Sequence, residues 1–231
     1  MEIIPGIHWI QGINGNVYVV AGEELVLIDT GMPHRAKKIA NYITQELQRP
    51  LSDLKWILLT HCDVDHIGNV QDLKRLSGAQ VAAHPIDAEV IAGRQTRARG
   101  APKGGMRLLM KMMTPLMKLF VHIPPFEVDL LLNDGDTVAG LEVYHVPGHS
   151  MGSIAFYDAQ RKVLFSGDEL MYRNGKLVIS VPIFTADASL ARLSAQKLSL
   201  LDFDTMLAGH GEPLQENASD KVREFIGTES P

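Results

Sequence analysis

Residues 58–69 (LLTHCDVDHIGN) contain four side chains that can bind a metal ion: His61, Asp63, Asp65 and His66. Imidazole and carboxylate are groups with which proteins hold zinc, iron and manganese. Side chains two positions apart in an extended loop point the same way, so His61 and Asp63 can face one point. Asp65 and His66 can face the same point from the start of a helix. The segment therefore predicts a metal site in a strand–loop–helix corner.

Three later residues of metal-binding type stand in similar positions. His149 (VPGHS), Asp168 (LFSGDE) and His210 (LAGHGE) each follow a predicted strand and lie beside a glycine. Glycine lets the backbone turn sharply and leaves room next to a site. Taken singly, either histidine would more often be structural, and Asp63 or Asp65 alone would fit a helix N-cap. The order and common position of all these residues indicate one shared site.

The hydrophobic pattern predicts the elements that position these residues. In the first half, strands are expected within residues 16–22, 24–31, 55–60 and 79–85, and helices within 34–48 and 67–78. In the second half, we expect a strand within 136–150, a hairpin over 153–168, a helix over 189–201 and a strand over 204–211. Strands followed by a helix, twice over, predict two sheets packed together with helices outside.

The motifs THxxxDH, PGHS, GD and GHG, in this order after an early LIDTG, resemble those of the metallo-β-lactamase superfamily of metal-dependent hydrolases. The resemblance covers nearly the whole chain except residues 93–126, and it implies a mixed α/β fold, a four-layer αββα sandwich with two metals at one edge of the sheets. It further implies a first metal on His61, Asp63 and His149, a second on Asp65, His66 and His210, and Asp168 between the two.

The chain departs from the common family motif HxHxDH at Asp63, where a histidine is usual. A carboxylate adds negative charge and a harder oxygen donor, which shifts the metal preference modestly toward iron or manganese. The flavodiiron branch of the superfamily carries an acidic residue at this place. We therefore expect two divalent cations, zinc first, with iron or manganese as alternatives and a site with a single metal as the simpler version.

The resemblance also implies a mechanism. Two cations that share a water lower its pKa from 15.7 to about 7, and the resulting hydroxide attacks a carbonyl or phosphoryl centre. By analogy with the family, Asp65 binds one metal and steers or accepts a proton. Tyr172 could donate a hydrogen bond to the substrate oxygen, or could simply pack under a loop. Asp29 is expected to orient the site through hydrogen bonds, and Cys62 to be a small buried side chain.

The bulk composition restricts the function classes. The chain has 231 residues, 45% of them hydrophobic, and a net charge of −5, which argues against general nucleic-acid binding. Its single cysteine cannot form an internal disulfide, which fits a reducing compartment, and no apolar stretch reaches the length of a membrane span. These features predict a cytoplasmic protein without a transmembrane segment.

Residues 93–126 differ from the rest of the chain. They include seven basic residues, no acidic residue and five of the ten methionines. We expect one domain over residues 1–231, with a Met-rich, basic helical insertion at 93–126. The insertion would form an adaptable wall over the substrate, which could be acyl-bearing or anionic. Its alternatives are a homodimer contact and a helix on a membrane surface.

The sequence therefore favours a metal-dependent hydrolase that acts on a small ester, lactone, thioester or phosphoester. One alternative is a diiron oxidoreductase, suggested by Asp63, which would need a separate electron donor because the chain has no room for a flavin domain. The other alternative is a binding module that needs metal but catalyses no reaction. Neither the substrate nor the identity of the metal follows from the residues.

Overall fold

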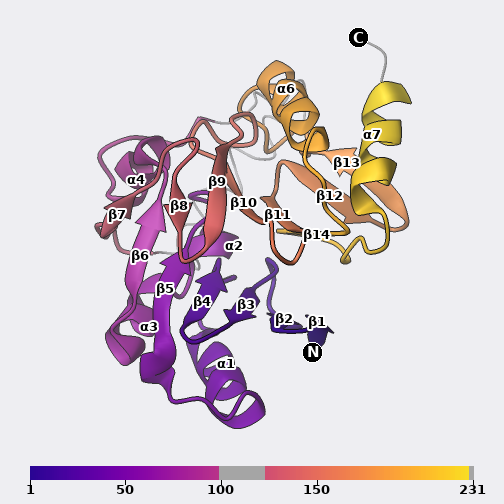
Figure 1. The fold of residues 1–231 in the computed structure, drawn as a ribbon. Helices are drawn as coiled ribbons and strands as arrows, with labels where there is room; N and C mark the ends of the chain where they lie inside the picture. Colours follow the sequence, from indigo (N-terminus) through magenta and orange to yellow (C-terminus); the bar gives the residue numbers. More distant parts are fainter. Residues whose placement is uncertain (99–122, 229–231) are drawn as a thin grey trace.

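The computed structural model describes residues 1–98 and 123–228, in which two β-sheets pack face to face with helices on both outer sides (Figure 1). Within these residues the first sheet has seven strands in chain order: β1 (Glu2–Ile4), β2 (Ile7–Trp9), β3 (Tyr18–Ala21), β4 (Leu25–Ile28), β5 (Leu54–Leu58), β6 (Gln80–Ala83) and β7 (Leu130–Leu131). Neighbours are antiparallel from β1 to β4 and parallel from β4 to β7.

The second sheet has the strand order β14-β11-β10-β9-β8 in the described chain. Its strands are β8 (Thr137–Val138), β9 (Leu141–His145), β10 (Ile154–Asp158), β11 (Val163–Gly167) and β14 (Thr205–Ala208). β12 (Leu170–Arg173) and β13 (Lys176–Ile179) form a separate hairpin. β11 and β14 run parallel, so the residues that follow these two strands leave the sheet at the same edge.

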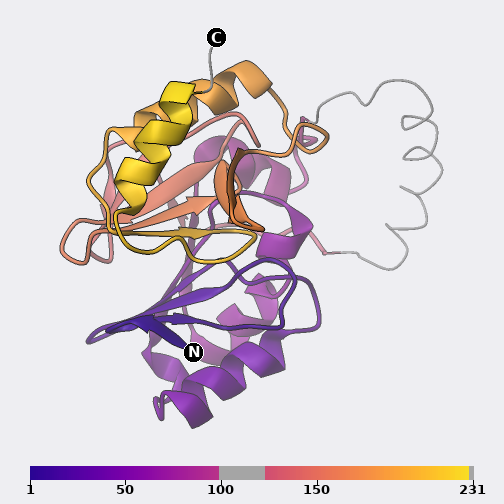
Figure 2. The same ribbon diagram turned by 90° about the vertical axis from the view of Figure 1, so that its right-hand side faces the viewer.

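Helices cover the outer face of each sheet (Figure 2). α1 (Ala36–Asn41) continues into the π-helical turn η1 (Tyr42–Glu46), and α3 (Val70–Ser77) packs beside it on the first sheet. α6 (Ala188–Ser199) and α7 (Ala218–Thr228) pack on the second sheet. The shorter elements η2 (Leu51–Asp53), α2 (Val64–Ile67) and α4 (Pro85–Ile91) lie in the crossovers of the first sheet. The predicted αββα sandwich is confirmed.

The interior between the sheets explains the hydrophobic pattern of the strands. Val20 and Val26 face Phe156 and Phe165 of the second sheet, whereas their neighbours, such as Leu27, face the helical layer. The central strands of the first sheet, β3 to β6, are therefore largely buried on both faces, and such strands form nearly continuous apolar runs. This is why residues 16–22, 24–31, 55–60 and 79–85 were recognisable as strands.

Several elements were not predicted. β1 and β2 have three residues each, and the hairpin β12–β13 has four residues in each strand, which is too short for a clear alternation of apolar and polar residues. α4 has seven residues, and the prediction of the second half ended before α7. The helix predicted over 67–78 is in fact two helices. The first, α2, begins at Val64, and Gly68 and Asn69 separate it from α3.

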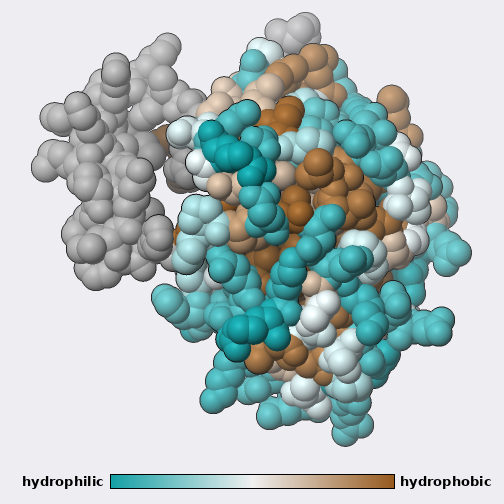
Figure 3. Space-filling view, turned by 90° about the vertical axis from the view of Figure 1, so that its left-hand side faces the viewer, coloured by the Kyte–Doolittle hydropathy of each residue, from teal (hydrophilic) through white to brown (hydrophobic). Residues whose placement is uncertain are grey.

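The insertion predicted at 93–126 lies mostly outside the described residues, so its helix and its methionines are not described. β7 forms the edge of the first sheet among the described strands, and its Leu130 and Leu131 are 38% and 51% exposed. Figure 3 shows the side of the molecule that carries this edge, where hydrophobic residues gather between hydrophilic ones. Across the described residues, every helix is too short or too polar to cross a membrane.

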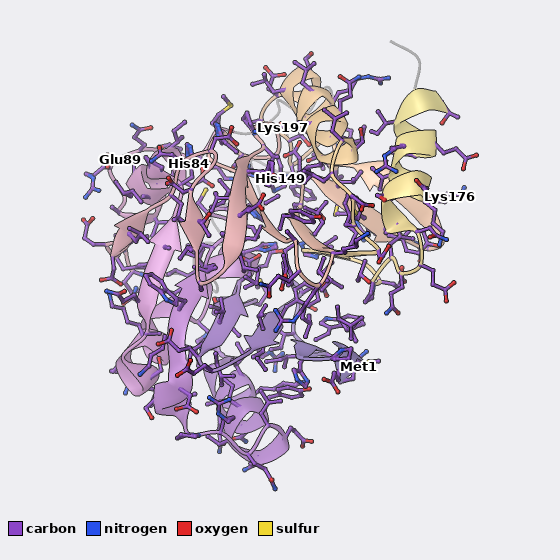
Figure 4. The ribbon with its side chains drawn as sticks, in the orientation of Figure 1. Met1, His84, Glu89, His149, Lys176 and Lys197 are labelled. Atoms are coloured by element: carbon purple, nitrogen blue, oxygen red, sulfur yellow. The ribbon has the colours of Figure 1, made fainter. Side chains whose placement is uncertain are left out.

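His84 gives this fold a dependence on pH. It is the N-cap of α4 (Figure 4). Its ring accepts a hydrogen bond from the backbone N of Ile86 (3.3 Å) and stacks on His145, with ring centroids 4.0 Å apart. Burial and, secondarily, the neighbouring His145 lower the pKa of His84 from 6.5 to about 4. Between these two values the unfolded chain takes up a proton that the folded chain refuses, so the free energy of unfolding falls as the pH falls through this range.

Replacing His84 by asparagine should weaken this dependence. Asparagine is a good N-cap and can still accept from Ile86, but it does not titrate. We expect the wild type to lose about 2 to 3 kcal/mol more of unfolding free energy than His84→Asn between pH 6.5 and 4, because the whole shift corresponds to about 3.4 kcal/mol and the remainder is lost outside this range. Urea unfolding of both proteins in the presence of a chelator measures the difference. Parallel pH dependences would contradict it.

Candidate metal centre

The corner that the sequence indicated lies between β5 and α2. Asp63 holds the N-cap position of α2 with an extended backbone, but its side chain makes no capping hydrogen bond. Its carboxylate instead turns toward the cluster, with Oδ2 3.7 Å from Nε2 of His61. The simple N-cap alternative for Asp63 therefore does not explain where its carboxylate lies.

A first group of candidate ligands consists of His61, Asp63 and His149, whose ligand atoms lie within 4.8 Å of one another. His149 lies inside the fold just beyond β9 (Figure 4). Its Nε2 is 3.1 Å from Oδ2 of Asp63. The tight turn before it requires glycine, since a Cβ on Gly148 would lie 2.3 Å from Cα of Ala191. The direct contact between this turn and α6 brings His149 to the corner.

A second group consists of Asp65, His66 and His210, also within 4.8 Å of one another. Nε2 of His210 lies 3.2 Å from Oδ2 of Asp65 and 3.4 Å from Nε2 of His66. His210 follows β14, and the residue before it must be small. A Cβ on Gly209 would lie 2.2 Å from Oδ1 of Asp168 and 2.6 Å from Cε1 of His66.

Asp168 lies between the two groups, directly after β11. Its Oδ1 is 3.6 Å from Nε2 of His66, and its Oδ2 is 3.8 Å from Nε2 of His149 and 3.4 Å from Nε2 of His210. One carboxylate thus contacts residues of both groups. The structure therefore brings together all seven residues that the sequence singled out, at the edge where β5, β9, β11 and β14 end.

A chain of hydrogen bonds fixes the orientation of His61 and His66. Nδ1 of His66 lies 2.8 Å from Oδ2 of Asp29, and it must donate because a carboxylate only accepts. The hydroxyl of Thr60 also donates to Oδ2 of Asp29, so its oxygen accepts from Nδ1 of His61 at 3.0 Å. Both imidazoles therefore carry the proton on Nδ1 and present an unprotonated Nε2 to the cluster when they are neutral. The hydrogen bonds expected of Asp29 are present, and its orienting role stays a prediction.

A second set of hydrogen bonds fixes the ring orientation of His149 and the proton on its Nδ1. Thr185 donates its hydroxyl proton to the carbonyl of Val181, so Ser180 donates to Thr185 and accepts from Nδ1 of His149 at 3.0 Å. Sequence reasoning missed Thr60 and Ser180. The position of Thr60 next to His61 was a local signal that could have pointed to it, but Ser180 is 31 residues from His149 and follows no motif.

The side chains present fit a bound metal. Among the described residues, the buried atoms Nε2 of His61 and Oδ1 of Asp168 have no hydrogen-bond partner. Burial, followed by the neighbouring histidines His66 and His149, holds the pKa of His61 well below its usual value, which keeps the ring neutral. A neutral imidazole is the form that binds metal. A buried atom without a partner costs free energy unless something completes the site, and a cation would do so.

Two buried carboxylates support the loops of the cluster. Asp87 of α4 accepts hydrogen bonds from the backbone N of Cys62 and Gly152 and from the hydroxyl of Ser150. Glu169 accepts from the backbone N of His149 at 3.0 Å, and burial raises the pKa of Glu169 to about 8. Neither residue was predicted, because each acts on a segment distant in sequence.

The side chains of Cys62 and Tyr172 pack against other parts of the fold, although the backbone of Tyr172 pairs with Gly211, the residue after His210. Cys62 packs in the layer between the first sheet and its helices, and burial raises the pKa of its thiol, as a structural role requires. Tyr172 of β12 packs among residues of the second sheet and lines a surface pocket with Lys221 and Phe225 of α7. This packing favours the structural alternative for Tyr172, and its catalytic role stays a prediction.

Comparison with known proteins places this geometry in a family. Residues 10–210 match the family model of the metallo-beta-lactamase superfamily. The chain belongs to the metallo-β-lactamase superfamily. Two solved structures share its fold. The metallo-beta-lactamase family protein TTHA1429 from Thermus thermophilus is 25% identical with a TM-score of 0.72, and the match covers 97% of this chain and 79% of that one. TTHA1623 in a di-iron-bound form is 28% identical with a TM-score of 0.69, and the match covers 95% of this chain and 98% of that one. The predicted fold and the predicted class of enzyme, a hydrolase of this superfamily, are both confirmed.

Curated relatives of this superfamily include enzymes with named substrates. The probable metallo-hydrolase YflN of Bacillus subtilis is 28% identical, over 92% of this chain and 86% of its own length. The human acyl-coenzyme A thioesterase MBLAC2 is 31% identical, over 77% of this chain and 67% of its own length. The hydroxyacylglutathione hydrolase of Pseudomonas syringae is 30% identical over 81% of this chain, which spans 60% of that enzyme.

Proposed function

We propose that the chain is a metal-dependent hydrolase of small acyl thioesters, with two divalent cations held by the seven clustered residues. The observation that carries this proposal is the position of Asp168 between two groups of three candidate ligands, within 3.8 Å of histidine nitrogens from both groups. Two relatives of the superfamily support the thioester, because their names state an acyl-coenzyme A and a hydroxyacylglutathione substrate.

Among the described residues, the most exposed part of the cluster is the side that carries Asp65 and His210, and a substrate would enter there. The side chains of Asp65 and His210 are 29% and 30% exposed, whereas those of His61, His66 and His149 are at most 3% exposed. A thioester carbonyl would therefore approach beside Asp65 and His210. The imidazoles of His61, His66 and His149 would keep their Nδ1 protons throughout and donate hydrogen bonds to Thr60, Asp29 and Ser180.

When bound, the cations would supply a hydroxide nucleophile at neutral pH and would polarise the carbonyl oxygen of the substrate. Asp65, exposed at the entrance, would hold the proton that the attacking water gives up and pass it to the departing thiolate. A thiolate is a good leaving group, and this scheme requires no serine or cysteine nucleophile. The buried position of Cys62 agrees with that expectation.

A panel of substrates tests this function. We expect the zinc-loaded protein to hydrolyse acyl-coenzyme A or acyl-glutathione thioesters with kcat/KM at least about tenfold above that for a matched oxygen ester, lactone or phosphodiester, a difference of about 1.4 kcal/mol in transition-state binding. Thiol release measures the reaction, and a chelator should abolish it. Faster turnover of the phosphodiester or lactone would contradict the thioester, and no turnover with metal bound would favour a binding module.

The metal and the cellular setting are further parts of the proposal. Zinc remains the first expectation, with iron or manganese as alternatives, and the di-iron form of TTHA1623 supports the iron alternative for this fold. Elemental analysis of protein purified without added metal distinguishes them. We also retain one domain over residues 1–231, a cytoplasmic location, and an insertion at 93–126 that covers the substrate, makes a homodimer contact or lies on a membrane surface.

A further inference from the structure

A buried arginine lies against the candidate metal centre. Arg97 follows α4, and its side chain is 8% exposed. Its Nε lies 2.6 Å from Oδ1 of Asp63, and its two terminal nitrogens donate to the backbone carbonyls of His149 and Phe184, each at 3.1 Å. The guanidinium therefore connects Asp63 to the loop that carries His149.

The two oxygens of Asp63 face different partners. Oδ1 lies on Arg97, while Oδ2 lies 3.1 Å from Nε2 of His149 and 3.7 Å from Nε2 of His61. A carboxylate held through one oxygen has the other fixed in direction. The ion pair with Arg97 thus leaves Oδ2 of Asp63 oriented toward the first group of candidate ligands.

The charges of the cluster give this pair a second role. Three carboxylates, Asp63, Asp65 and Asp168, offset three of the four positive charges of two divalent cations. Arg97 returns one positive charge, so the complete centre carries the same charge as one with a neutral imidazole at position 63 and no arginine. A buried guanidinium beside cations is unfavourable unless a carboxylate pairs with it, and Asp63 is that carboxylate.

We propose that Asp63 and Arg97 act as one unit, in which Arg97 is a positioning residue for the first cation. Arg97 orients Asp63 and balances its charge, so an imidazole at position 63 can work only when the guanidinium is also removed. This inference rests on the proposed metal centre, but not on the thioester substrate.

A double-mutant cycle tests the proposal through zinc affinity, measured by competition with a chelator, and zinc content per chain. In the wild-type background, Arg97→Met should raise the dissociation constant of the first zinc about tenfold, since partners of metal ligands typically contribute 10- to 100-fold. Asp63→His alone should raise it at least about as much, because it leaves the guanidinium unpaired beside the cation. In the Asp63→His background, Arg97→Met should lower the dissociation constant, to within about threefold of the wild type.

Two matched variants separate this effect from a general loss of structure. Arg94→Met removes another arginine of the same segment, one whose side chain is 49% exposed and pairs with Glu89 and Glu127, and it should not restore zinc binding to Asp63→His. Arg97→Lys keeps the charge and should not restore it either. Thermal unfolding of the metal-free variants checks that each one folds.

The decisive outcome is the direction of the effect of Arg97→Met in the two backgrounds. Opposite directions support the unit, and the same direction in both overturns it, because a purely structural arginine would weaken zinc binding in each. A wild-type protein that binds no divalent cation would overturn the metal centre and this inference together. Zinc binding with the expected cycle, but without thioester turnover, would overturn only the proposed substrate.

Discussion

Replacing Asp168 by alanine should abolish the binding of one cation and nearly all hydrolysis. Asp168 is the one carboxylate of the described cluster that contacts histidines of both groups, at 3.4 to 3.8 Å. Loss of a residue that only supports a ligand typically costs 10- to 100-fold in metal affinity, so the loss of a shared ligand should cost more than about 100-fold. The carboxylate would also screen the repulsion between the two cations. Zinc content per chain and kcat/KM for a thioester measure the two effects.

Asp202→Ala is the control for this variant, because Asp202 is a surface carboxylate, 67% exposed, that pairs only with Lys162 among the described residues. It should leave zinc content and kcat/KM within about twofold of the wild type, as is usual for surface substitutions. Asp168→Asn keeps the shape and one oxygen, and should fall between the alanine variant and the wild type. An Asp168→Ala protein that retains two zinc ions per chain would contradict the position assigned to this residue.

The sequence predicted those parts of the centre that depend on local chain geometry. His61, Asp63, Asp65 and His66 occupy one corner, so their spacing alone was informative. His149, Asp168 and His210 were predictable for a different reason, since each follows a strand of the second sheet or its continuation. Strands that enter one sheet bring the residues beyond their ends to a common edge, and the order of the motifs supplied the rest.

Residues that act across the chain could not be predicted in this way. Ser180 holds His149 from 31 positions away, and Asp87 holds the backbone N of Cys62 from 25 positions away. Arg97 belongs to the basic stretch that the sequence attributed to an insertion over the substrate, yet its side chain is buried against Asp63. A serine, an aspartate or an arginine without a motif carries no signal of its partner. Only the three-dimensional contact reveals it.

The strands, like the site residues, were predictable only where the local sequence carries a signal. β4, β5 and β6 were predicted because burial on both faces gives them continuous apolar runs. The hairpin of β12 and β13 was not predicted, since its strands have four residues each and these residues range from buried to exposed without a clear alternation. The hairpin matters for function nevertheless, because Ser180 comes directly after β13.

Asp29→Asn is the second substitution with a large expected effect. Asp29 is 2% exposed, has a positive φ of 57°, and accepts hydrogen bonds from the backbone N of Thr60, the hydroxyl of Thr60 and Nδ1 of His66. Asparagine tolerates the left-handed backbone as well as aspartate does, and its carbonyl oxygen can still accept from Thr60. The amide nitrogen that replaces Oδ2, however, cannot accept from His66. The substitution therefore removes the hydrogen bond that places the proton of His66 on Nδ1.

Without that acceptor, the imidazole of His66 is free to carry its proton on Nε2, the atom that faces the cluster, and an Nε2 that carries a proton cannot bind a cation. We expect the dissociation constant of the second zinc to rise about 10- to 100-fold. Competition with a chelator measures this change. In the metal-free wild type, burial lowers the pKa of His66, but Asp29 and Asp168 outweigh burial and raise it to about 10. Nitrogen NMR of the metal-free proteins above that pH should show the neutral ring of His66 protonated on Nδ1 in the wild type and on Nε2 in the variant.

Asp158→Asn provides the comparison that isolates orientation from burial. Asp158 is also 2% exposed, but it lies at the end of β10 and pairs with Arg161. Both variants should lower the free energy of unfolding, because each removes a buried charge from its partners. Only Asp29→Asn should weaken zinc binding and alter the tautomer of His66. Equal zinc affinities in the two variants would mean that Asp29 stabilises the fold without orienting His66, and the hydrogen-bonded chain from Asp29 through Thr60 to His61 would then have no part in preparing the centre for metal.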